Sequence, residues 1–253
     1  MAAEVKILVE GFTNADSKAE SGGEEKTCPT VSLVRDEGIV MVVDPGAVDS
    51  QQILVDKLKQ EGLEVKDVNF VCITHSHVDH YMNVGMFPNA KILEYFGVWD
   101  KGRVEDWREV FSENIMVFRT PGHDNTSITL FVRTEKGMAA VCGDVFWKEN
   151  YPEEDLYATE PQKLEKSRRL VLEMADWVVP GHGAMYKVRK GQVSGKEEPH
   201  GIAAHKTKEI VINCKKCRRP MEHTNRCLCR PWLCYRCCEC GIDCDFCSCS
   251  HKK

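Results

Sequence analysis

The sequence predicts an α+β fold in which β-sheets pack on one another and helices lie outside them. Predicted strands follow one another in runs instead of alternating regularly with helices, and this order is typical of α+β domains. The chain of 253 residues is also long enough for one sizeable core and a small appendage, because single cores stop growing at about 250 to 300 residues. We therefore expect one main domain followed by a short tail.

Nine segments have the apolar periodicity or the β-branched content of strands. In chain order they lie at 5–10, 30–35, 39–43, 70–74, 91–94, 115–119, 128–133, 138–142 and 177–179. Amphipathic patterns predict helices over about 49–61, closed by Gly62, and over 161–174. The polar, acidic stretch 13–27 is expected to be a mobile loop.

Residues that can bind a metal ion gather where these strands end. The strand over 70–74 leads directly into His75-Ser76-His77-Val78-Asp79-His80, and His123, Asp144 and His182 each follow a later strand beside a glycine. Neutral imidazoles bind divalent ions, and carboxylates add charge and can bridge two of them. Any one of these histidines alone is explained as well by an ordinary turn, whereas the ordered set favours a metal site.

This ordered set resembles the ligand signature of the metallo-β-lactamase superfamily. The resemblance implies an αββα sandwich, in which two sheets pack face to face, helices lie outside, and metal ions bind at one edge. It also implies that His75, His77 and His123 hold a first ion, that Asp79, His80 and His182 hold a second, and that Asp144 bridges them. Two zinc ions are expected, although iron or manganese suits the same ligands.

Two carboxylates have further expected roles. Asp44 matches the family's acidic residue after an early strand, and it is expected to orient ligand histidines from outside. The alternative is that Asp44 only begins the Asp-Pro-Gly turn. Asp79 is expected to transfer protons as well as bind metal. Two ions sharing a water lower its pKa, so the expected nucleophile is a metal-bound hydroxide.

Further segments resemble one branch of the superfamily, over about residues 4–190. They are Asn83–Pro88, Pro121-Gly122-His123, Gly143–Phe146, Ser167-Arg168-Arg169 and Ala175–Gly183. Ser167-Arg168-Arg169 is expected to be a solvated helix face, with a phosphate clamp as the alternative. This resemblance implies an endoribonuclease that cleaves RNA phosphodiesters in histone pre-mRNA 3′-end processing, as a homodimer with two zinc ions in cytoplasm and nucleus. A glyoxalase II-like thioester hydrolase is the second hypothesis, and a one-iron persulfide dioxygenase is the third.

The cysteines mark a domain boundary, because eleven of the 14 lie between Cys214 and Cys249. We expect a hydrolase domain over 1–190, a polar linker over 191–213 and a cysteine-rich tail over 214–253. Pairs of cysteines with two residues between them are typical of zinc sites. The candidate ligands are Cys214, Cys217, Cys234, Cys237, Cys240, Cys244 and Cys247. Because arginines and aromatics lie among them, a zinc-dependent RNA-binding or partner-binding adaptor is an alternative function. A tail without a biological role is the other interpretation.

Charge and hydropathy narrow the function classes. Residues 214–253 hold nine Lys/Arg and four Asp/Glu, which gives this segment a net charge of +5. Because the net charge of the whole chain is −5, residues 1–213 carry a net charge of −10. The body is therefore not a nucleic-acid binder by charge alone. No apolar run reaches the roughly 18 to 20 residues of a membrane span, and the N-terminus does not resemble a secretory signal. We expect no membrane association and a cytoplasmic or nuclear location.

Overall fold

The computed structural model describes residues 2–15, 24–107, 110–189, 222–223 and 235–236. The chain divides into two units, Met1–Gln192 and Val193–Lys253. In the second unit, β15 (Glu222–His223) pairs with β16 (Tyr235–Arg236). The predicted linker over 191–213 lies outside the described residues, and so do all the predicted zinc ligands of the tail, from Cys214 to Cys247.

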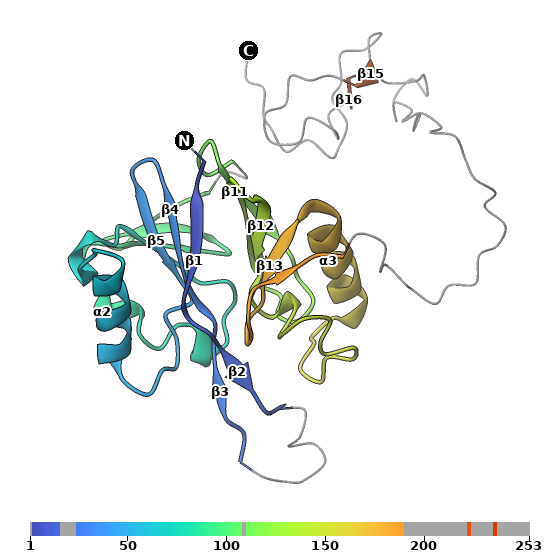
Figure 1. The fold of residues 1–253 in the computed structure, drawn as a ribbon. Coiled ribbons are helices and arrows are strands. Elements are labelled where there is room, and N and C mark those ends of the chain that lie inside the picture. Colours follow the sequence, from blue (N-terminus) through green and yellow to red (C-terminus); the bar gives the residue numbers. More distant parts are fainter. Residues whose placement is uncertain (1, 16–23, 108–109, 190–221, 224–234, 237–253) are drawn as a thin grey trace, which may run out of the picture. The chain divides into compact units, whose positions relative to one another are not determined.

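Two mixed sheets build the first unit (Figure 1). The seven-stranded sheet has the order β1 (Glu4–Val9), β4 (Val31–Asp36), β5 (Ile39–Val43), β6 (Phe70–Cys72), β7 (Lys91–Glu94), β8 (Gly97–Asp100) and β9 (Arg103–Glu105). The five-stranded sheet has the order β10 (Ile115–Arg119), β11 (Ile128–Thr134), β12 (Gly137–Val141), β13 (Trp177–Val179) and β14 (Tyr186–Lys187). A separate short ladder joins β2 (Phe12–Thr13) to β3 (Thr27–Cys28).

One helix covers the outer face of each sheet (Figure 1). Helix α2 (Gln51–Gln60) buries Leu54 and Leu58 in a cluster with Leu33 of β4. Helix α3 (Pro161–Met174) buries Leu164 in a cluster with Phe131 of β11. Short 3₁₀ turns lie at Val65–Asp67, Val78–His80, Val84–Met86 and Gly143–Val145.

The central core lies between the two sheets. Along β4, Leu33 faces helix α2 while its neighbour Val34 faces the other sheet. Along β11, Phe131 likewise faces helix α3 while Leu130 and Val132 face inward. Successive side chains of a strand point to opposite faces, so strands covered on both faces need nearly continuous apolar sequence. The predicted α+β fold, an αββα sandwich, is confirmed.

Some local expectations need correction. The stretch 13–27 was predicted to be loop throughout, but its ends belong to strands, because Thr13 pairs with Thr27 and Phe12 with Cys28. Strands β8, β9 and β14 were not predicted. They are short strands, of which β9 and β14 lie at sheet edges and β8 lies next to an edge. Their mostly exposed residues have no apolar periodicity by which to recognise them.

Strand direction determines where the functional side chains lie. Strands β5, β6 and β7 are parallel to one another, and so are β12 and β13. A backbone hydrogen bond of 2.8 Å from Ile128 N to Thr74 O joins the two sheets beside the loop that follows β6. The ends of strands from both sheets therefore meet at one edge of the sandwich. Among the described residues, no helix has the length and apolar content needed to cross a bilayer.

Candidate metal centre

The structure brings the seven histidine and aspartate ligands predicted at the strand ends together in two groups. Within each group the ligand atoms lie within 4.8 Å of one another. The first group is His75, His77, His123 and Asp144, and the second is Asp79, His80 and His182. These groups coincide with the two ligand sets that the sequence resemblance implies.

Three imidazoles of the first group point at one small volume. Nδ1 of His77 lies 3.1 Å from Nε2 of His75 and 3.0 Å from Nε2 of His123. The Oδ2 atom of Asp144 lies 3.3 Å from the same His123 nitrogen. Three ring nitrogens and a carboxylate oxygen are a donor set that divalent metal ions bind.

Asp144 lies between the two groups. Its carboxylate oxygens lie 3.3 Å from Nε2 of His182 and 3.4 Å from Nε2 of His80, in addition to the contact with His123. Asp79 approaches the second group from the open side, with Oδ2 at 3.7 Å from both His80 and His182. The side chain of Asp79 is 21% exposed, whereas that of Asp144 is 6% exposed.

The ligands fit a metal centre because the protein alone leaves this cluster unsatisfied. The Oδ1 atom of Asp144 is buried and has no hydrogen-bond partner. A buried acceptor without a partner is costly, and a charged one more so. Cations bound by these ligands would compensate both this carboxylate and the crowded imidazoles.

Asp44 orients His80 from outside the cluster. It directly follows β5 and has a φ of 51°, in the left-handed region. Its Oδ2 accepts hydrogen bonds from Nδ1 of His80 at 2.9 Å and from the Thr74 hydroxyl at 2.7 Å, and its Oδ1 accepts one from the Thr74 backbone N–H at 2.8 Å. A ligand histidine held in this way keeps its other nitrogen directed at the metal.

Asp155 supports His123 in the same way, and the sequence did not reveal it. Its Oδ2 accepts a hydrogen bond from Nδ1 of His123 at 2.6 Å, and its side chain is fully buried. Asp155 also accepts a hydrogen bond from the backbone N–H of Tyr157 at 2.9 Å. No local motif distinguishes it from its acidic neighbours Glu153 and Glu154.

Thr27 of β3 is a second residue that the sequence did not reveal. Its hydroxyl lies 3.2 Å from Oδ2 of Asp79 and 3.2 Å from Nδ1 of His182. Nδ1 of His182 also lies 3.0 Å from the backbone oxygen of Cys28. The β2–β3 ladder therefore positions two members of the second ligand group.

Close packing around the site requires glycine at two positions. A Cβ atom at Gly181 would lie 1.8 Å from Oδ1 of Asp144, and one at Gly46 would lie 1.6 Å from the backbone oxygen of Asp79. Any larger residue at either position would displace a ligand or its backbone.

The electrostatics of the site favour uptake of cations. Burial and neighbouring imidazoles lower the pKa values of His75 and His77, so these rings are neutral and free to bind metal at pH 7. Burial also lowers the pKa of His80, but the surrounding carboxylates, first Asp144, raise it to about 9. Although burial raises the pKa of Asp144, His182 and other imidazoles hold it well below its ordinary value. In the absence of metal, a protonated His80 compensates part of the negative charge of the Asp144 carboxylate but leaves Oδ1 without a hydrogen bond.

Helix α3 supports the site from its buried face. Ser167 donates a hydrogen bond to the backbone oxygen of Pro121 at 2.7 Å, and Nε of Arg168 donates one to that of Val145 at 3.0 Å. These bonds hold the backbone close to two ligands, His123 and Asp144.

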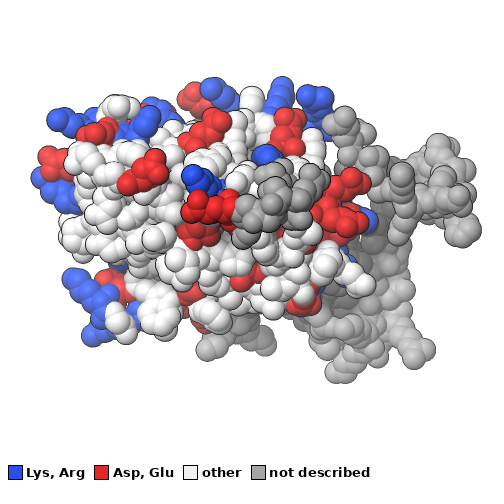
Figure 2. All heavy atoms as spheres, turned by 90° about the horizontal axis from the view of Figure 1, so that it is seen from below, with Lys and Arg blue, Asp and Glu red and all other residues white. Residues whose placement is uncertain are grey.

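A small cavity opens over the cluster. Two aromatic rings, Trp147 and Tyr157, stack at 5.8 Å on one side, and the indole of Trp147 also packs edge-on against His123. The charged residues of the cavity wall are all acids or metal ligands, with Glu25 at its rim, and no described lysine or arginine lines it. Figure 2, seen from the β2–β3 end, shows uncharged and acidic surface over most of this face, with basic side chains mainly toward its edges.

The sandwich and the two ligand groups at its edge define a metal-dependent hydrolase. The sequence profile of the metallo-beta-lactamase superfamily matches residues 29–116. The metallo-beta-lactamase domain-containing protein 1 of Xenopus laevis is 31% identical over 204 residues, which cover 76% of this chain and 85% of that protein. The chain belongs to the metallo-β-lactamase superfamily.

Solved structures show the same fold. A putative metallo-beta-lactamase from Thermotoga maritima aligns with a TM-score of 0.60 at 23% identity, covering 74% of this chain and 100% of that one. An N-acyl homoserine lactone hydrolase, with its product bound at the catalytic metal centre, aligns with a TM-score of 0.54 at 17% identity, covering 72% of this chain and 92% of the hydrolase.

Proposed function

We propose that this hydrolase is an endoribonuclease that cleaves RNA phosphodiesters. The observation that carries the proposal is the position of Asp144, whose carboxylate contacts histidines of both ligand groups. Paired metal sites that share a bridging group are used repeatedly for in-line displacement at phosphorus, as in nucleases and phosphatases. The sequence resemblance to an RNA-cleaving branch of the superfamily supports the same substrate.

Divalent ions bound by these ligands, of which zinc is the one we expect, supply a water of lowered pKa and polarise the scissile bond. The protein's own residues hold and orient the reacting groups. Asp79 is the most exposed carboxylate of the cluster, and it is placed to accept a proton from the attacking water at Oδ2. Thr27 fixes the orientation of that carboxylate through its hydroxyl.

A second candidate is hydrolysis of an ester or thioester, as in a glyoxalase II-like enzyme. The observation that favours it is the cavity wall, in which no described lysine or arginine is available to bind a polyanion. The lactone hydrolase that shares this fold acts on a carbonyl carbon. A small neutral acyl substrate suits such a wall better than a long phosphate backbone.

Two substrates separate the candidates. Metal-loaded wild type and the His77→Ala and Asp79→Asn variants are assayed on a labelled single-stranded RNA and on S-lactoylglutathione. The first proposal expects RNA cleavage by the wild type and a loss of at least about 100-fold in both variants. Turnover of the thioester without RNA cleavage would instead establish the second candidate.

We also propose that the enzyme is a homodimer that acts in the cytoplasm and nucleus. Light scattering of the purified chain tests the first statement, and imaging of a tagged chain tests the second. The tail-based adaptor function remains a further hypothesis. Removing the residues after Lys208 tests it, because hydrolysis is then unchanged while binding of RNA or a partner is lost.

A further inference from the structure

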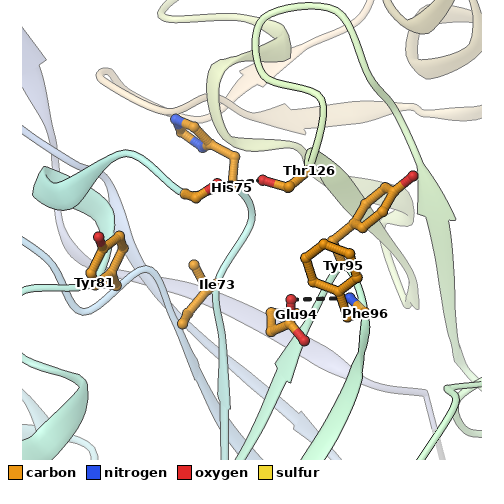
Figure 3. Close-up of a pocket in the computed structure, with 8 residues that line it drawn as sticks. Ile73, His75, Tyr81, Glu94, Tyr95, Phe96 and Thr126 are labelled. Carbon is orange, nitrogen blue, oxygen red and sulfur yellow. Dashed lines mark hydrogen bonds between the residues drawn. The ribbon is translucent and has the colours of Figure 1, made fainter.

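A second cavity lies beside the ligand loop and outside the metal centre (Figure 3). Ile73 and His75 form one wall, Tyr81 follows the loop, and the β7–β8 turn contributes Tyr95 and Phe96. The cavity holds about 160 Å³, less than the ~300 to 1,000 Å³ of sites that enclose a whole drug-sized ligand. It therefore fits one ring-sized group of a larger substrate.

Three of the eight residues that line this cavity are aromatic. Figure 3 shows the rings of Tyr81, Tyr95 and Phe96 around the opening, and 62% of Phe96 is exposed to solvent. The acidic lining residue, Glu94, is already engaged, because it accepts hydrogen bonds from Nε1 of Trp99 at 2.6 Å and from the backbone N–H of Phe96 at 3.0 Å. Exposed rings at such a small opening favour a flat aromatic group that can stack.

A cation lies next to this aromatic wall. The guanidinium of Arg119, at the end of β10, lies 4.7 Å from the centroid of the Tyr95 ring and 5.2 Å from that of Trp107. Arg119 is exposed, and it forms no ion pair with any residue that the structure describes. Arginine binds phosphate through several N–H groups at once, and stacking on aromatic rings keeps it in place.

We propose that this cavity binds a nucleobase of the RNA beside the scissile bond, and that Arg119 binds a neighbouring phosphate. The inference rests on the proposed function and specifies how that site would hold its substrate. His75 lines the cavity and also belongs to the first ligand group. A base held here would therefore lie beside a residue of the metal centre. The aromatic wall supplies stacking, and Arg119 supplies the positive charge that the cavity over the metal cluster lacks.

Binding of small probes tests the site without any cleavable bond. Adenosine 5′-monophosphate, adenosine and ribose 5-phosphate are titrated into the metal-loaded full chain by calorimetry. We expect ribose 5-phosphate to bind at least tenfold more weakly than the nucleotide, because it has no base to stack. Phe96→Ala and Tyr95→Leu should raise the Kd of the nucleotide about tenfold, while Tyr95→Phe stays within twofold. Because Phe96 is exposed, Phe96→Ala should leave the stability of the fold unchanged.

The phosphate contact has its own signature and control. Arg119→Ala should raise the Kd of the nucleotide about fivefold and leave that of adenosine unchanged. The control is Arg133→Ala, which removes an exposed arginine at the other end of β11. It should change neither of these two Kd values.

Two results would overturn the base site. One is equal affinity for nucleotide and ribose 5-phosphate, and the other is nucleotide affinity unchanged in both Phe96→Ala and Tyr95→Leu. A higher KM for S-lactoylglutathione in Phe96→Ala, with no nucleotide binding, would also overturn it and assign the cavity to an acyl substrate. The expected probe pattern without RNA cleavage would support the nucleotide site and contradict only the proposed function.

Discussion

Nδ1 of His123 donates a 2.6 Å hydrogen bond to Oδ2 of Asp155, a fully buried carboxylate that no sequence motif reveals. On the other side of the centre, Asp44 holds His80 with a bond of 2.9 Å. Each ligand group therefore has its own acidic support outside the metal centre. Such supports fix the ring orientation and make the coordinating nitrogen more basic.

Asp155→Asn should weaken metal binding by about 10-fold to 100-fold, because the neutral amide no longer fixes and polarises His123. Competition with a coloured chelator measures the affinity. Glu154→Gln, an exposed neighbour, is the matched control and should bind metal like the wild type. Equal affinities for both variants would show that Asp155 only packs against the loop.

Thr27→Val should lower kcat about tenfold, because Asp79 and His182 lose the hydroxyl that lies 3.2 Å from each. Thr27→Ser keeps the hydroxyl and should retain most of the activity. Circular dichroism checks that the β2–β3 ladder remains folded. If valine and serine variants lose activity equally, the methyl group of Thr27 matters and its hydroxyl does not.

Gly181→Ala should destabilise the chain by about 1 to 3 kcal/mol and reduce its bound metal, since the new Cβ would lie 1.8 Å from Oδ1 of Asp144. Gly85→Ala adds the same methyl group where nothing lies within 4 Å, and its stability should be unchanged. Urea unfolding and metal analysis measure the two effects. Normal metal content in Gly181→Ala would contradict the close packing described here.

The metal-free protein should lose stability as the pH rises from 6.5 to 9. The pKa of His80 is raised from 6.5 to about 9 in the folded state, so its contribution is fully present below pH 6.5 and lost as the pH passes 9. His182, which Asp144 stabilises in its protonated form against the effect of burial, has a raised pKa and adds to the same trend. We expect the Tm to fall by about 5 °C over this interval.

Calorimetry at several pH values measures this loss. The metal-loaded protein is the control, and its Tm should hardly change between pH 6.5 and 9, because bound cations take the place of the protons. A metal-free protein that gains stability toward pH 9 would show that Asp144 and His80 do not form the charged pair inferred here.

The residues that the structure brings together in the two ligand groups could be picked out from the sequence because each follows a strand whose apolar pattern is strong. Strands β5, β7, β10 and β13 have the predicted bounds, and His123 and His182 lie just beyond two of them. Thr27 and Asp155 could not be predicted in the same way. Each acts on a partner far along the chain, 155 positions from Thr27 to His182 and 32 from Asp155 to His123, and neither belongs to a periodic segment.

Helix α3 contains buried polar residues that the sequence pattern did not identify. The sequence Ser167-Arg168-Arg169 is expected to be a solvated helix face, but Ser167 and Arg168 are directed to the site loops and only Arg169 pairs at the surface, with Glu165. Helical periodicity identifies a buried face by its apolar residues. It does not identify polar side chains that are buried to satisfy backbone oxygens.

The central claim is that two groups of ligands hold two metal ions with Asp144 between them. Anomalous diffraction from crystals of the metal-loaded full chain, recorded on both sides of the metal absorption edge, tests it most directly. The account predicts one peak among His75, His77 and His123, a second among Asp79, His80 and His182, and the Asp144 carboxylate in contact with both. A single peak, or no peak with these side chains turned away from one another, would contradict it.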